Sequence, residues 1–205
     1  MFANKKIWCI SVLLLAVNLF AAENVKNVEK PSLAEEVLKA VISGKSRDMA
    51  HNDKLFMVPF EKMPEIYKKK CTPDSYCYDE EHKFAWVSPV DIDGDGTREM
   101  LALEMHSGAN GATYYCVLTK INGKWVEAGN LFAVFVSLME FNGRRGLLED
   151  SKCGGFSRTY TFYELKNGRL VPSVIIKFDR FFEKDDCQLK MQVFDSEKSR
   201  LDYLF

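Results

Sequence analysis

The chain has 205 residues, of which 28 are basic and 29 acidic, so its formal net charge is −1. This near balance argues against nucleic acid as a partner, because surfaces that bind nucleic acid carry an excess of Lys and Arg. The hydrophobic share of 47% is ordinary for a globular domain. The 15 Phe and 8 Tyr residues favour β structure.

The first 22 residues have the features of a secretory signal peptide. Lys5 and Lys6 form a positive start, an apolar run covers residues 7–17, and Ala21–Ala22 offers a small-residue cleavage site. The apolar run is too short for a convincing membrane span, although an uncleaved anchor is the alternative. We therefore expect a periplasmic or secreted protein with no stable membrane insertion once residues 1–22 are removed.

A flexible segment over residues 23–31 is expected to precede a single β-rich domain over residues 32–205. Ser32 and Glu35 form a capping-box pattern at the start of a helix. Apolar residues then recur at helical spacing along one face, and Gly44 ends the pattern. We expect this helix to cover a face or an edge of a sheet.

Two short elements are expected before the acidic loop. Residues 55–58 favour a strand, which Pro59 stops. Residues 61–70 favour a short helix that is kinked at Pro64.

The segment from Asp91 to Glu99 has the chemistry of a calcium-binding loop. Calcium takes about six to eight oxygen ligands, and loops that bind it supply carboxylates at alternate positions. Gly94 and Gly96 permit the positive φ values that a sharp turn requires. The expected ligands are four carboxylates and one backbone carbonyl, namely those of Asp91, Asp93, Asp95, Glu99 and Thr97. The alternative is a solvated acidic turn that holds no ion.

The flanking residues predict strand–loop–strand rather than the helix–loop–helix of an EF-hand. An EF-hand loop ends in a bidentate Glu, and the corresponding residue here is Ala102. Pro89 disfavours a helix on the entering side. With these strands, residues 86–106 resemble the FG-GAP/VCBS type of repeat, whose blades carry an Asp-x-Asp-x-Asp-Gly-x-x-Asp loop, here with Glu99 at the last position. Because the sequence contains one copy, the resemblance implies a calcium loop and not a whole propeller.

From Phe84 onward the pattern predicts an antiparallel meander. Four Asn-Gly pairs, at residues 110, 122, 142 and 167, are typical of hairpin turns. Pro172 indicates that the strand over residues 170–178 lies at a sheet edge. The expected strands after the acidic loop cover residues 114–119, 124–128, 131–140, 159–165, 170–178, 188–194 and 201–205.

Removal of the signal peptide leaves five of the six cysteines, which are disulfide candidates in an exported protein. Because five is odd, at least one is free or pairs between chains. Cys71 and Cys77 are near neighbours and form the first expected pair. Cys153 and Cys187 form the second, and Cys116 lies in an apolar strand pattern that predicts a buried thiol.

No enzyme motif is present in the sequence, which contains no Gly-x-Ser-x-Gly elbow, no phosphate-binding loop and no ligand-spaced His pair. We therefore expect an exported binding or interaction module that has a structural calcium and a protein or glycan partner. The alternative is a small secreted hydrolase that uses the cation in catalysis. Its nearest candidate bases are Glu104 and His106.

Overall fold

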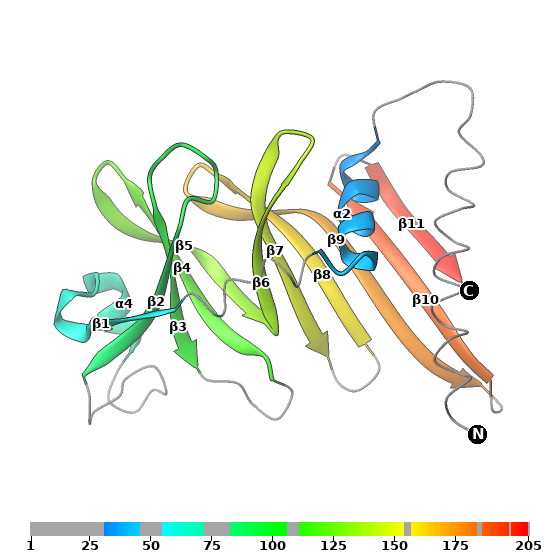
Figure 1. Cartoon of the computed structure of the whole chain (residues 1–205), viewed down its shortest axis with the longest axis horizontal. Helices are drawn as coiled ribbons and strands as arrows, with labels where there is room; N and C mark the ends of the chain where they lie inside the picture. Colours follow the sequence, from blue (N-terminus) through cyan, green and yellow to red (C-terminus); the bar gives the residue numbers. More distant parts are fainter. Residues whose placement is uncertain are drawn as a thin grey trace.

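The computed structural model describes residues 31–45, 55–71, 83–105, 111–153, 157–183, 186–196 and 198–204. These segments form two antiparallel sheets, and a short helix packs against each sheet (Figure 1). The expected fold class, a mainly β antiparallel meander with one N-terminal helix, is confirmed. The predicted signal peptide and flexible segment lie outside the described residues. Within the described part of the chain, no helix has the length and apolar character needed to cross a membrane.

Within each sheet, strands that follow one another in the sequence pair with each other. The first sheet has the order β1-β2-β3-β4-β5 and the second the order β11-β10-β9-β8-β7-β6. The five-stranded sheet contains β1 (Phe56–Pro59), β2 (Phe84–Val90), β3 (Glu99–Met105), β4 (Thr113–Ile121) and β5 (Lys124–Ala133). The six-stranded sheet contains β6 (Phe135–Phe141), β7 (Arg144–Cys153), β8 (Ser157–Lys166), β9 (Arg169–Glu183), β10 (Asp186–Asp195) and β11 (Lys198–Leu204).

Three of the four predicted Asn-Gly turns are confirmed. In the pairs Asn122–Gly123, Asn142–Gly143 and Asn167–Gly168, both residues have positive φ. This backbone conformation gives two-residue hairpins whose twist matches that of the strands they join. The fourth pair begins at Asn110, which lies outside the described residues.

The apolar run over residues 131–140, predicted as one strand, is divided between the two sheets. β5 ends at Ala133 and β6 begins at Phe135, so the chain changes sheet at Val134. The backbone N–H of Val134 donates to the carbonyl of Asp150 at 2.7 Å. No Gly or Pro marks the change. Ala133 before it and Val136 after it are buried in the same core, so the apolar pattern continues across the break.

Three apolar clusters hold the layers together. The central cluster joins the two sheets and includes Leu101, Val117 and Leu147. A second cluster packs the helix α2 (Leu33–Ile42) against the six-stranded sheet. A third packs the 3-10 turn η2 (Phe60–Lys62) and the helix α4 (Glu65–Lys70) against the five-stranded sheet.

The helix α2 begins as the sequence predicts. Ser32 is its N-cap: the Ser32 Oγ accepts from the backbone N–H of Glu35 at 3.3 Å, and the Glu35 carboxylate accepts from that of Ser32 at 2.7 Å. Val37, on the packed face, is fully buried. The expected covering of a sheet by this helix is therefore confirmed.

Two sequence predictions around proline are wrong. Pro64 does not kink one helix but separates η2 from α4, because proline is tolerated at a helix start and not within it. Pro172 does not mark an edge strand, since β9 lies between β8 and β10. Pro172 precedes the segment of β9 that pairs with β10, which begins at Val174, and it lies opposite Tyr163 at a register shift. Its missing N–H therefore removes no bond to β10.

Candidate metal centre

The acidic loop connects β2 to β3. Val90 and Glu99 form the last pair of that hairpin, so the loop begins and ends at one end of the five-stranded sheet. Ile92 is fully buried in the central cluster, whereas Asp93 through Arg98 are exposed. The apolar side chain of Ile92 thus anchors the loop, and the polar residues after it remain at the surface. The predicted strand–loop–strand arrangement is confirmed.

Hydrogen bonds from backbone to side chain shape the loop. Asp91 Oδ1 accepts from the backbone N–H of Gly94 at 2.8 Å, and Asp93 Oδ1 accepts from that of Asp95 at 3.2 Å. Gly94 and Gly96 have φ values of +82° and +85°, which side-chain-bearing residues rarely adopt. The short Asp side chains and the two glycines therefore explain why this sequence makes a tight turn.

Glu99 is the buried member of the acidic group, with only 2% of its surface exposed. Its Oε2 accepts from the backbone N–H of Ile92 at 2.8 Å, and its Oε1 accepts from the Thr119 hydroxyl at 3.1 Å. Burial raises the pKa of Glu99, and the charge of Asp93 adds to that rise, whereas the bonds from Ile92 and Thr119 oppose it. The fold therefore holds Glu99 in an environment that opposes its negative charge.

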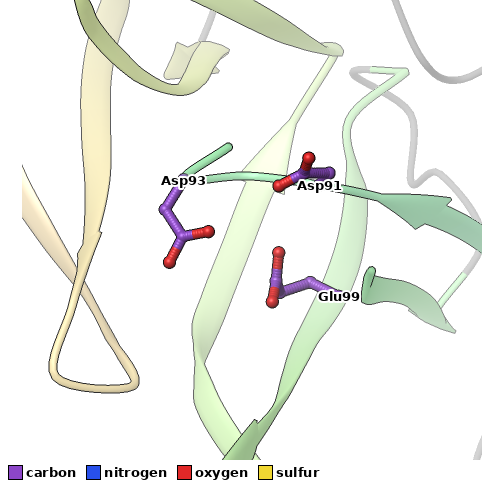
Figure 2. A group of neighbouring side chains, drawn as sticks. All are labelled: Asp91, Asp93 and Glu99. Atoms are coloured by element: carbon purple, nitrogen blue, oxygen red, sulfur yellow. The ribbon is translucent and has the colours of Figure 1, made fainter. Parts of the chain in front are cut away.

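Three carboxylates meet at this point. One oxygen from each of Asp91, Asp93 and Glu99 lies within 4.8 Å of the others. Figure 2 shows the Asp91 and Asp93 side chains from the loop and the Glu99 side chain from the start of β3 converging on one space. Calcium binds oxygens at about 2.3–2.6 Å, so two oxygens on opposite sides of one ion stand roughly 5 Å apart. The spacing of this group therefore fits a single ion.

The Asp95 carboxylate is not part of that group, which consists of side chains and so does not test the Thr97 carbonyl. Asp95 Oδ1 accepts from the backbone N–H of Thr97 at 2.6 Å, which closes the far side of the loop. The participation of the Asp95 carboxylate and the Thr97 carbonyl in metal binding stays a prediction.

Thr119 is a residue of the candidate site that the sequence analysis missed. It lies on β4, next to the Met100–Leu118 pair of β3 and β4, and so faces Glu99 across the sheet. The only signal would have been the strand register, which depends on the length of the connection between the two strands.

A cationic side chain from the other sheet lies against the loop. Arg145 of β7 places its Cδ 3.4 Å and its Nη1 3.9 Å from the position that a Cβ on Gly94 would occupy. The buried Arg145 Nε has no hydrogen-bond partner among the described residues. No salt bridge joins Arg145 to Asp91, Asp93 or Glu99 within the described segments.

The cysteines are only partly within the described side chains. Cys71 takes part in a disulfide, and the predicted partner Cys77 lies outside the described residues. The side chains of Cys153 and Cys187 also lie outside them, so that predicted pair stays a prediction. Cys116 is a free thiol and fully buried. Burial raises its pKa to about 12, so it remains protonated and unreactive.

Of the two candidate bases of the hydrolase alternative, Glu104 does not join the acidic group. Glu104 accepts from Lys70 Nζ at 3.1 Å, and Lys70 also pairs with Glu127 at 2.7 Å. His106 lies outside the described residues.

Comparison of the chain with protein-family models, with curated proteins and with solved structures gave no match.

Proposed function

We propose that this chain is an exported β-rich binding module in which the β2–β3 loop binds a structural calcium ion. The observation that carries the proposal is the convergence of Asp91, Asp93 and Glu99, whose oxygens lie within 4.8 Å of one another. Close carboxylates without a cation repel one another, and a bound divalent ion removes that cost.

The donor set favours calcium over other cations. The group offers oxygen alone, whereas zinc and copper sites use His nitrogen or Cys sulfur. Magnesium demands near-ideal octahedral geometry, whereas calcium tolerates the irregular geometry of a flexible loop. Most of this loop is exposed, which leaves room for water ligands.

The position of the group favours a structural role. Asp91 follows β2, Glu99 begins β3, and Thr119 of β4 bonds to Glu99. An ion at this point would connect the ends of adjacent strands and order the exposed loop between them. The local resemblance to the FG-GAP/VCBS loop supports the same role, and a signal peptide would place the protein where calcium is abundant. Loops of extracellular modules bind calcium with a Kd of about 10⁻⁴–10⁻³ M.

A surface for a protein or glycan partner is supported by apolar residues at the edge of the five-stranded sheet. Phe56 and Met57 of β1 are 59% and 58% exposed, and Trp86 of β2, which lies opposite Met57, is 37% exposed. Exposed apolar groups gathered at one edge are typical of interaction sites. Pro59 ends β1 without an N–H, which limits pairing of this edge with another strand.

The hydrolase alternative is less well supported. Glu104 accepts a hydrogen bond from Lys70, the last residue of α4. Lys70 also approaches Cys116, which packs in the third apolar cluster, between α4 and the five-stranded sheet. Glu99 instead accepts from the backbone N–H of Ile92, whose side chain is buried in the central cluster between the two sheets. Glu104, on the opposite face of the sheet, is therefore not placed to activate a water at the candidate metal.

Thermal unfolding of the purified protein in chelator, followed by titration of calcium and then magnesium, tests the proposal. We expect calcium to raise the midpoint by several degrees, because a ligand at about 100 times its Kd stabilises the fold by about 2.7 kcal/mol. Asp93→Asn should abolish this response.

Asp95→Asn removes a carboxylate from the same loop but outside the converging group, so it tests whether Asp95 is a further ligand. A lost response in Asp93→Asn would support the assignment, and the response of Asp95→Asn would show whether Asp95 also binds the ion. A wild-type midpoint that does not change with calcium would show that the loop is an ordinary acidic turn.

A further inference from the structure

We propose that Arg145, on the other sheet, sets how tightly the β2–β3 loop holds its cation. The inference rests on the proposed calcium site and adds a residue that lies more than forty positions away in the sequence. Arg145 follows the Asn142–Gly143 turn and is the second residue of β7. Its side chain crosses from the six-stranded sheet to the loop of the five-stranded sheet, where it lies against Gly94.

The contact divides the side chain into two parts with different effects. The Cδ atom lies 3.4 Å from the Cβ position of Gly94, so the aliphatic part packs against the loop backbone. The guanidinium follows, with Nη1 at 3.9 Å from the same point. Its charge therefore lies against Gly94, whose N–H bonds to Asp91, and it is partly shielded from solvent, because the neighbouring Nε is buried.

Other charged groups near the loop do not replace this charge. Glu140 lies opposite Arg145 on β6, yet the two form no salt bridge within the described segments. Arg98 belongs to the loop itself but is exposed, so solvent screens it. The adjacent Arg144 is bound to Glu164 at 2.5 Å, which neutralises its charge locally.

Arg145 thus acts on the loop in two directions. In the absence of a metal ion its charge reduces the repulsion among Asp91, Asp93 and Glu99. When a divalent ion binds, the same charge opposes it. Even at the dielectric constant of water, a unit charge within several ångströms of a divalent ion weakens its binding by roughly tenfold.

Calorimetric titration of the purified protein with calcium chloride tests the inference. Arg145→Gln removes the charge, and we expect it to lower the calcium Kd roughly tenfold. Arg145→Lys keeps the charge and should retain a Kd close to that of the wild type. Arg145→Met keeps most of the aliphatic contact with Gly94 and should also bind more tightly, which covers the case in which Arg145→Gln does not fold.

Added salt separates a charge effect from a packing effect. At about 0.5 M salt the difference between wild type and Arg145→Gln should shrink, because screening weakens the repulsion. A Kd that is unchanged or higher in both neutral variants would overturn the role of Arg145 while leaving the calcium site intact. Absence of calcium binding in all four proteins would overturn the calcium site and this inference together. Binding by the neutral variants alone would support the inference.

Discussion

Two buried carboxylates of the six-stranded sheet, Asp150 and Glu164, are stabilised differently from the carboxylates of the β2–β3 loop. Asp150 of β7 is only 2% exposed and receives two bonds of 2.6 Å from the Arg158 guanidinium. Glu164 of β8 receives bonds of 3.0 Å and 2.5 Å from Arg144. Arg158 and Arg144 thus supply the cations for Asp150 and Glu164, whereas the buried Glu149 of β7 accepts from the Phe132 N–H and the Tyr163 hydroxyl.

The loop has no such pairing among the described residues. Glu99 is as buried as Asp150 but is bound by an amide and a hydroxyl, and two further carboxylates lie beside it. Arg145 approaches the loop and packs against Gly94, but within the described segments it forms no salt bridge with these carboxylates. A buried charge is costly unless it is paired, so a group of three close carboxylates without a salt bridge supports the proposal that the loop takes a cation from solution.

The largest expected effect comes from removing a guanidinium in the six-stranded sheet. Arg158→Gln leaves the Asp150 carboxylate buried and unpaired, and we expect a loss of about 3 kcal/mol in the free energy of unfolding. Urea unfolding at neutral pH measures this loss. The double variant Asp150→Asn with Arg158→Gln should recover part of it. A loss below about 1 kcal/mol in Arg158→Gln would show that the pair behaves like an exposed one.

Acid should weaken the six-stranded sheet through Glu164. Burial alone would raise the pKa of Glu164, but hydrogen bonds from Arg144, Ser173 and Lys166 outweigh it and lower the pKa to about 2 from its ordinary 4.5. Because the folded pKa is the lower one, the stabilisation is complete above pH 4.5 and is lost as the pH falls toward 2. After allowance for solvent screening, we expect a contribution of about 1–2 kcal/mol.

Unfolding free energies of wild type and Glu164→Gln across this pH range measure that contribution. The two curves should converge at the acidic end and separate toward pH 5, with the wild type the more stable. Parallel curves over the whole range would remove Glu164 as the source of the acid sensitivity.

The smallest effect should have the opposite sign. In chelator, Glu99→Gln is expected to stabilise the fold by about 1 kcal/mol, the order of the repulsion between charges about 5 Å apart in water. Since burial raises the pKa of Glu99, its charged form destabilises the fold as the pH rises above the ordinary value. The same variant should lose the calcium response. Thermal midpoints in chelator and in calcium measure both results, and a destabilised variant in chelator would show that Glu99 is not under electrostatic strain.

Local features of the fold could be predicted because their partners are close in the sequence. The capping box of α2 needs only Ser32 and Glu35, and each hairpin turn needs only its own Asn-Gly pair. The acidic loop is local in the same sense, since Asp91 and Glu99 are separated by a single turn. Such features are recognisable because short-range sterics and hydrogen bonds determine them.

Other features depended on segments far apart in the chain. The break at Val134 has no local marker in the sequence. The residues around Pro172 predict an edge strand, because they do not show that β10 pairs with β9 only from Val174 onward. The contacts of Thr119 with Glu99 and of Arg145 with Gly94 likewise require the register of two sheets.

The sequence by itself determined a β-rich chain with a capped helix, defined turns and an acidic loop capable of binding a hard cation. Only the tertiary structure decided which carboxylates of that loop converge, which one is buried and which arginine lies beside them. The physical reason is that turn geometry is set within a few residues, whereas burial and charge pairing are set by the packing of one sheet against the other.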